Sequence, residues 1–224
     1  MTAQLRRIVS INVGQPREVE AGDRRVLTSI FKEPVQGKVA LRHYNVQGDR
    51  QSDLSVHGGP NKAVYSYSAE HYLFWTVQLP GTPLPFGAFG ENLTTEGMLE
   101  EGVHIGDVFR AGSAILKVTQ PRMPCFKLAI RMNRSDMVRR FWASGRSGIY
   151  FSIVEEGEFE SGDRIEPLES DPRRVSVADV VRLYKRETED LDLFSRVMQA
   201  PVSGSWKQEI RERWAQSPAN GYWK

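Results

Sequence analysis

Short apolar runs rich in β-branched residues recur along the first two thirds of the chain, and glycine, proline or polar residues separate them. Runs of this kind, bounded by turn residues, are typical of short β-strands. They occupy residues 8–13, 26–31, 39–44, 63–66, 103–109, 114–120 and 149–154. The pattern therefore predicts a mostly antiparallel sheet or a closed β-barrel.

Two segments in the same region have apolar residues at helical spacing instead. Residues 68–75 begin with Ser68, a residue suited to an N-cap, and the segment ends before Pro80 and Gly81. Residues 135–144 form the second, with Gly145 at the position where a helix C-cap would lie. We expect two helices that flank the barrel.

The composition changes after Pro167, where residues 169–174 form a polar, proline-containing link. Three helical segments follow: one from Ser176, with capping-box-like spacing to Asp179, one over residues 190–200, and one from Ser203 or Ser205. Helices this short are only marginally stable alone in water, so they must pack on each other or on a neighbouring part of the protein. The pattern predicts a mostly β fold with some α, divided into a β-barrel domain over residues 1–168 and a small three-helix domain over residues 169–224.

Composition excludes some classes of protein and of site, and it indicates no particular function. The chain has 224 residues, 40% hydrophobic and 26% charged, which suits a globular protein with a real core. The net charge of +2 gives no global reason to expect nucleic acid or a membrane surface as a partner. No leader-like or membrane-spanning apolar stretch is present, so we expect a cytoplasmic protein. A single cysteine, Cys125, excludes an internal disulfide and a multi-cysteine metal site.

The segment from Val56 to Val64 combines an imidazole, two adjacent glycines and a cation, in the order His57, Gly58, Gly59, Lys62. Glycines let backbone N–H groups approach an anion closely, and a lysine could neutralise it. A tight turn between strands explains the glycines equally well. Sequence chemistry alone leaves both interpretations open.

A second glycine-flanked segment covers residues 87–93 and presents Glu91 and Asn92. One interpretation makes both residues turn formers. The other assigns Asn92 to hydrogen bonding with a heterocycle, because an amide both donates and accepts hydrogen bonds.

The third segment, residues 120–128, contains the cysteine between two prolines and two cations. A lone cysteine is more often a small buried hydrophobe than a reactive group. Here Arg122 and Lys127 would lower the pKa of the thiol if they face it, and Pro121 and Pro124 would restrict the backbone of the loop. A soft thiolate suits a transition metal, and an organic cofactor can supply the other ligands.

Three motifs in order, VHGGPNKAVY, FGENL and QPRMPCFKL, resemble those of the MOSC domain family, named for the C-terminal region of molybdenum-cofactor sulfurase. The segments KEPVQG and GDRQ fit as well, and the helical tail is similar to the three-helix extension of the YiiM-like branch. The resemblance implies a closed MOSC-type β-barrel with flanking helices. It also implies a molybdenum cofactor, molybdopterin with molybdenum, held by Cys125 as the protein's ligand to the metal.

The other cofactor-binding roles of the family would fall on Lys32, His57, Lys62, Asn92 and Arg122. The implied activity is reduction of N-hydroxylated compounds, such as 6-hydroxylaminopurine, to amines, a detoxifying reaction. Electrons would come from a separate reductase, a flavoprotein or an iron–sulfur protein. Asp49 or His57 could relay protons, since either side chain titrates usefully in a suitable environment.

Two other functions stay open at this point. Cys125 could be a nucleophile activated by His57, as in cysteine hydrolases. Alternatively, the protein could store or hand on the cofactor without catalysis. The C-terminal helices could pack as core, or they could contact the electron donor or the second subunit of a homodimer.

Overall fold

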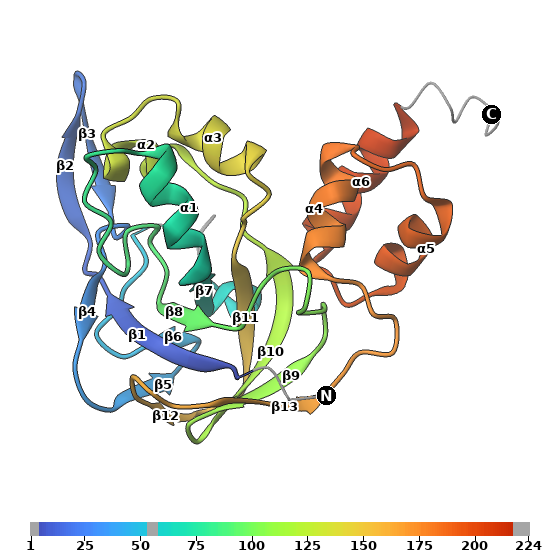
Figure 1. Cartoon of the computed structure of the whole chain (residues 1–224), viewed down its shortest axis with the longest axis horizontal. Coiled ribbons are helices and arrows are strands. Elements are labelled where there is room, and N and C mark those ends of the chain that lie inside the picture. Colours follow the sequence, from blue (N-terminus) through green and yellow to red (C-terminus); the bar gives the residue numbers. More distant parts are fainter. Residues whose placement is uncertain (1–4, 53–57, 217–224) are drawn as a thin grey trace.

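The computed structural model describes residues 5–52 and 58–216, and it has a mixed α/β fold built around an eight-stranded sheet (Figure 1). The strand order is β13-β9-β10-β11-β7-β8-β1-β4. Neighbouring strands are antiparallel except β7 and β8, which run parallel. The strands are β1 (Arg7–Val13), β4 (Glu33–Val35), β7 (Val64–Ser68), β8 (Leu93–Glu96), β9 (Val108–Ala111), β10 (Ala114–Pro121), β11 (Ile149–Glu155) and β13 (Ile165–Glu169).

Two smaller sheets and the helices surround this sheet. A three-stranded sheet has the order β12-β5-β6, and β2 pairs with β3 as a hairpin that projects at the left of Figure 1. These strands are β2 (Arg17–Ala21), β3 (Arg24–Thr28), β5 (Val39–Arg42), β6 (Asn45–Val46) and β12 (Gly157–Phe159). The helices are the 3₁₀ turn η1 (Pro60–Lys62), α1 (Glu70–Gln78), α2 (Phe126–Met132), α3 (Met137–Ala143), α4 (Val177–Lys185), α5 (Leu191–Gln199) and α6 (Gly204–Ala215).

The apolar pattern located most of the long strands correctly. The predicted strands at residues 8–13, 114–120 and 149–154 correspond to β1, β10 and β11. The strand predicted over residues 103–109 is wrong over residues 103–107, since β9 begins only at Val108. The preceding residues form a turn instead, because the Asp107 carboxylate accepts a hydrogen bond from the His104 backbone N–H at 3.1 Å.

Both helices predicted within the β-rich region exist, with one error in a cap. Residues 135–144 contain α3, and Gly145 follows it with a positive φ of 71°. Ser68 is not the N-cap of α1, because it is the last residue of β7 and its hydroxyl donates to the Met98 carbonyl at 2.6 Å. The helix begins two residues later, at Glu70.

A closed barrel is not found among the described strands, which corrects the expectation from the sequence. The edge of β1 that does not pair with β8 has two different partners. Residues Ile11–Val13 pair with β4, and the first half of β1 meets the turn before β13 through backbone hydrogen bonds of 2.8–2.9 Å, such as Ile8 N–H to the Asp163 carbonyl. Because β4 already occupies part of this edge, β1 and β13 are joined only by an isolated bridge between Arg7 and Arg164. The sheet curls towards closure without a continuous ladder.

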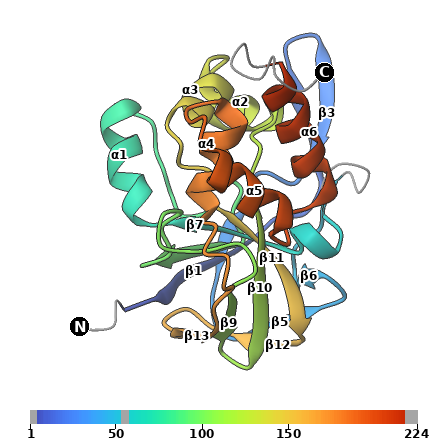
Figure 2. The same ribbon diagram turned by 90° about the vertical axis from the view of Figure 1, so that its right-hand side faces the viewer.

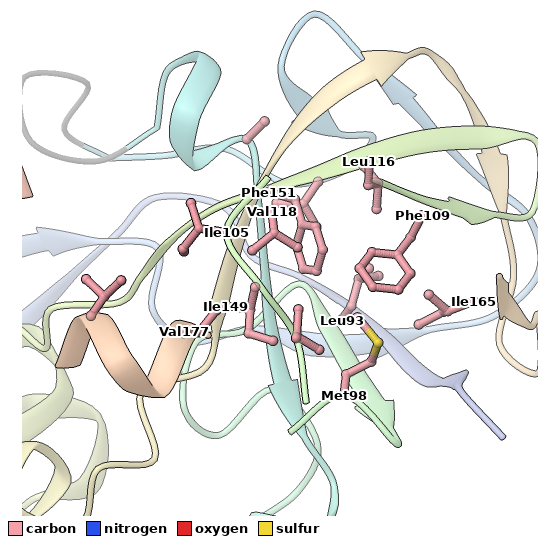
Figure 3. Packing of buried hydrophobic residues seen from close by; sticks show 14 of the residues in the cluster. Leu93, Met98, Ile105, Phe109, Leu116, Val118, Ile149, Phe151, Ile165 and Val177 are labelled. Atoms are coloured by element: carbon pink, nitrogen blue, oxygen red, sulfur yellow. The ribbon is translucent and has the colours of Figure 1, made fainter. Parts of the chain in front are cut away.

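The C-terminal helices α4, α5 and α6 lie together beside the sheet (Figures 1 and 2). The predicted capping box is confirmed, because the Ser176 hydroxyl accepts from Asp179 N–H and the Asp179 carboxylate accepts from Ser176 N–H. Buried residues of these helices, such as Val177 and Leu193, belong to the same apolar cluster as the sheet (Figure 3). The division into domains at residues 168 and 169 therefore stays a prediction about independent folding.

The main core lies between the strands of the curled sheet, where Leu116 and Phe151 belong to it, and α4 adds Val177 to it (Figure 3). A second cluster lies under α1, α2 and α3, and its aromatic rings include Tyr67, Trp75, Phe89 and Phe141. In the ranges 5–52 and 58–216, no helix has both the length and the apolar character needed to cross a membrane.

Candidate functional site

A pocket forms where the loops after β3, β6 and β10 meet the starts of β7, β8 and α2. Six residues that the sequence singled out line it, namely Lys32, Asp49, Lys62, Asn92, Arg122 and Cys125. The seventh, His57, lies outside the described residues, although its neighbour Gly58 lines the same pocket. The structure thus gathers side chains that are up to 93 positions apart in the chain, Lys32 and Cys125 being the most distant pair.

Asp49 is the centre of a buried polar network on one wall. Its Oδ1 accepts hydrogen bonds from the Lys32 ammonium and from the Gly14 backbone N–H, the latter at 2.8 Å. Its Oδ2 accepts from the Asn92 amide at 2.9 Å. A buried carboxylate with three donors is held in one orientation, so Asp49 fixes the position of Lys32 beside the pocket.

Burial lowers the pKa of Lys32 because it removes the ammonium from water, and the attraction of Asp49 opposes this shift. The amide of Asn92 has two fixed partners: it donates to Asp49, and its Oδ1 accepts from the Tyr65 backbone N–H at 3.2 Å. One amide hydrogen of Asn92 is left for a ligand. Asn92 is thus a structural link between the strand ends as well as a candidate binding residue.

Glu91, beside Asn92, is completely buried and holds its own loop together. It accepts hydrogen bonds from the backbone N–H groups of Gly87 at 2.9 Å and Phe89 at 3.1 Å, from the Thr94 hydroxyl at 2.9 Å, and from the Tyr72 hydroxyl. Burial raises the pKa of Glu91, and the hydrogen bonds oppose the shift. The turn-forming interpretation of Glu91 agrees with these contacts.

Arg122 is buried in the wall of the pocket and has two kinds of partner. Its guanidinium donates to the Phe89 carbonyl, which the Glu91 loop positions. It also lies over the Tyr65 ring, 4.6 Å from the ring centroid. A guanidinium remains charged at any physiological pH, so Arg122 supplies a permanent positive charge to the pocket.

Cys125 immediately precedes α2 and is half-buried, so its thiol is neither sealed in apolar packing nor fully in water. Arg122 and Tyr150 are close enough to the thiol to interact with it electrostatically. Lys127 is buried nearby, and its ammonium donates to the Ser52 hydroxyl at 3.0 Å. Both cations that flank the cysteine in the sequence therefore line the same pocket as the cysteine.

The Gly-Gly segment ends in the short helix η1, with Lys62 as its last residue. Gly58 and Gly59 have φ values of 88° and 78°, in the left-handed region that favours glycine. The turn interpretation of this segment and the anion-binding one are compatible here, because the tight turn brings Lys62 to the pocket.

Sequence reasoning missed several lining residues. Tyr65 and Tyr150 lie opposite each other on β7 and β11, with ring centroids 5.1 Å apart. Tyr65 ends the Gly-Gly motif and could have been noticed, whereas Tyr150 has no local signal. Ser29 also lines the pocket, and its buried hydroxyl has no hydrogen-bond partner within the described ranges.

The described lining of the pocket is strongly positive, with Lys32, Arg50, Lys62, Arg122 and Lys127 against one carboxylate, that of Asp49. Such a lining favours an anionic ligand such as a phosphate. Within residues 5–52 and 58–216, no group of three or more His, Cys, Asp or Glu side chains could hold a metal ion. A metal beside Cys125 would therefore need most of its ligands from a bound organic group.

A half-buried thiol in a cation-lined pocket on a curled sheet agrees with the resemblance found in the sequence, and the chain belongs to the MOSC family. The family model, described as the MOSC domain, matches residues 53–166. Among curated proteins, YflK of Bacillus subtilis is 40% identical over 92% of this chain and 93% of its own length. Protein YiiM of Escherichia coli is 34% identical, covering 83% of this chain and 84% of its own.

Solved structures extend the same comparison to the fold. YiiM of Geobacillus stearothermophilus superposes with a TM-score of 0.76 at 34% identity, covering 94% of this chain and all of the other. YiiM of Escherichia coli superposes with a TM-score of 0.72 at 28% identity, covering 94% of this chain and 92% of the other. Both structures cover 94% of this chain, so the likeness extends well beyond the residues 53–166 that the family model matches.

Proposed function

We propose that this protein is a molybdenum-cofactor-dependent oxidoreductase that reduces N-hydroxylated compounds, such as 6-hydroxylaminopurine, to amines. The observation that carries the proposal is the Cys125 thiol, half-buried at the wall of a pocket lined by five cationic side chains. A thiolate can bind a transition metal, and the cations can hold the phosphate of its organic carrier.

The comparisons support the coarser part of this proposal. MOSC domains are associated with binding of the molybdenum cofactor, and the region that the family model matches includes Lys62, Asn92, Arg122 and Cys125 of the pocket. A Gibberella moniliformis protein named "Reductase" is 31% identical over 94% of this chain, which spans only 38% of that longer protein. An oxidoreductase role agrees with that name.

The described residues fit the cofactor in kind and in number. Cys125 would bind the metal, and Lys32, Lys62 and Arg122 would hold the phosphate, together with His57 outside the described ranges. Asn92 has one amide hydrogen left for the pterin. The unpartnered Ser29 hydroxyl in the pocket wall is a further group that a polar ligand would satisfy.

The reaction breaks an N–O bond: the hydroxylamine takes two electrons and two protons and yields an amine and water. When bound, the cofactor would supply a two-electron redox centre that accepts oxygen from the substrate. The electrons would come from a separate flavoprotein or iron–sulfur reductase. Asp49 and His57 are the proposed proton relays, although the three hydrogen bonds on Asp49 favour its role in holding Lys32.

The test compares wild-type protein with Cys125→Ser, both produced in cells with ample molybdenum-cofactor supply. We expect about one molybdenum per wild-type chain, reduction of 6-hydroxylaminopurine with reduced methyl viologen, and loss of both in the variant. Ser52→Ala is the matched control, because it changes a hydroxyl in the same pocket that is not a proposed metal ligand.

The two alternative functions predict different results. A Cys–His hydrolase would turn over an ester or amide in molybdenum-free protein and would be inactivated by alkylation of Cys125. A cofactor carrier would contain molybdenum yet reduce no hydroxylamine with any donor. Wild-type protein without molybdenum despite full supply would contradict the proposed function.

A further inference from the structure

A pair of arginines beside the pocket has no role in the site described above. Arg17 on β2 and Arg131 on α2 both lie against the Phe31 ring, with their guanidinium carbons 3.8 Å and 5.0 Å from its centroid. Phe31 stands between Ile30 and Lys32, which both line the pocket. Arg131 also lies four residues after Lys127, so the two side chains project from the same face of α2.

Among residues 5–52 and 58–216, neither arginine of this cluster forms a salt bridge, although the charges of Glu33 and Glu91 also act on Arg131. The Arg131 Nε is buried without a hydrogen-bond partner in the same part of the chain. Burial and the nearby charge of Arg17 both lower the pKa of Arg131. Two close guanidiniums with donors to spare form a site for an anion that accepts several hydrogen bonds.

The distance along α2 agrees with a ligand that spans from the cysteine to this cluster. Arg131 lies six residues after Cys125, which corresponds to a rise of about 9 Å along a helix. In a purine nucleotide the exocyclic nitrogen and the 5′-phosphate lie at opposite ends of the molecule, on a comparable scale. The two ends could therefore reach the cysteine and the arginine cluster together.

The rim around the cysteine suits the middle of such a ligand. Met123 and Phe126 flank Cys125 in the sequence and are 39% and 59% exposed, which is unusual for large apolar side chains in a polar loop. An exposed phenylalanine and methionine offer a stacking surface to a flat heterocycle. The cations that line the pocket are proposed to hold the phosphate of the cofactor, and Arg17 and Arg131 would hold the phosphate of the substrate.

We propose that Arg17 and Arg131, which both contact the Phe31 ring, bind the phosphate of a nucleotide, so that the preferred substrates are N-hydroxylated nucleoside phosphates rather than free bases. This inference rests on the proposed function, because the hydroxylamino group must reach the site at Cys125. It adds the class of substrate that the pocket selects.

The experiment compares 6-hydroxylaminopurine with its ribonucleoside 5′-monophosphate, using molybdenum-loaded protein and reduced methyl viologen. We expect wild-type kcat/KM to be at least about tenfold higher for the nucleotide, which corresponds to about 1.4 kcal/mol. Arg17→Gln and Arg131→Gln should each remove most of this preference and leave kcat/KM for the free base within about twofold. Arg211→Gln is the matched control, since Arg211 is an exposed arginine on α6, far from the β2–β3 hairpin in Figure 1.

A binding measurement makes the result independent of turnover. Calorimetry with adenosine 5′-monophosphate and with adenosine should show tighter binding of the nucleotide to wild type, and loss of that difference in both variants. Equal binding and equal kcat/KM for phosphorylated and free forms would overturn the inference and leave the proposed function intact. Slower reduction of the free base by a protein donor, with normal rates from methyl viologen, would instead assign the cluster to an acidic redox partner and overturn the nucleotide assignment.

Discussion

Replacement of Glu91 by glutamine tests how the loop over residues 87–91 supports the pocket. Glu91 is 0% exposed, and it accepts hydrogen bonds from four donors on two carboxylate oxygens. Glutamine has the same shape but only one accepting oxygen. If that oxygen takes the Oε1 position, it keeps three donors, and the amide NH₂ then faces the Phe89 N–H.

The glutamine NH₂ and the Phe89 N–H are then two buried donors that face each other without an acceptor. Each unsatisfied donor lowers the stability of the folded state by about 1–3 kcal/mol. Removal of a buried charge offsets part of this loss. We therefore expect Glu91→Gln to lower the free energy of unfolding by about 2–4 kcal/mol near pH 7. The Phe89 carbonyl holds Arg122, so the variant should also retain less molybdenum cofactor.

The pH dependence gives a second, independent readout. The pKa of Glu91 is raised above 4.5 in the folded protein, so the native state binds more protons than the unfolded state as the pH falls through this range. Wild type gains stability there and the glutamine variant does not, so the difference between them should grow from neutral pH towards pH 4.5. The stability that wild type gains from protonation of Glu91 is fully present below pH 4.5, and it is lost as the pH rises through the raised pKa of Glu91.

Urea unfolding followed by tryptophan fluorescence measures both effects, with Glu101→Gln as the matched control because Glu101 is exposed. The control should change stability by less than about 0.5 kcal/mol. A similarly small change in Glu91→Gln, at both pH values, would refute the assignment of Glu91 as the anchor of the loop.

Three further outcomes are expected. Cys125→Ser should fold with a Tm close to that of wild type, because the half-buried thiol has little packing to lose, and should reject molybdenum; normal metal content would contradict its role. Phosphate affinity, measured by calorimetry, should weaken as the pH rises through the lowered pKa of Lys32, below 10.5, because only the ammonium attracts the anion; Lys32→Met should bind weakly at every pH. Ser176→Ala should lower the free energy of unfolding by about 1 kcal/mol in urea, because Asp179 N–H loses its cap, and an unchanged midpoint would count against the capping box.

Local chemistry explains where the sequence predicted structure well. The strand at residues 114–120 has buried apolar residues at the alternate positions Ala114, Leu116 and Val118, and the cap at Ser176 depends only on Asp179 three residues later. Both signals are complete within one element. The strand β8 had no such signal, because its threonines are buried and satisfied by hydrogen bonds such as Thr95 to Ser66 at 2.9 Å. Polar residues inside a sheet contradict the alternation rule until their partners are known.

The candidate site also contains residues that the sequence indicates and contacts that only the tertiary structure creates. Motifs that resemble those of the MOSC family pointed to Lys32, Asp49, Lys62, Asn92, Arg122 and Cys125, because such motifs are visible in the chain itself. That Asp49 holds Lys32 and Asn92, and that Tyr150 faces Tyr65 across two strands, follows only from strand pairing. Arg17 and Arg131, separated by 114 positions in the chain, have no common signal in the sequence.

The sequence by itself determined which residue types are available, the helix cap at Ser176, the long strands and the motifs of the MOSC family. Tertiary structure decided how the sheet ends, because β4 takes part of the edge of β1 that a closed barrel would need. It also decided which loops share one pocket. Local preferences act over a few residues, whereas the meeting of loops depends on pairing between strands far apart in the chain, and that pairing is stabilised only when the whole core is packed.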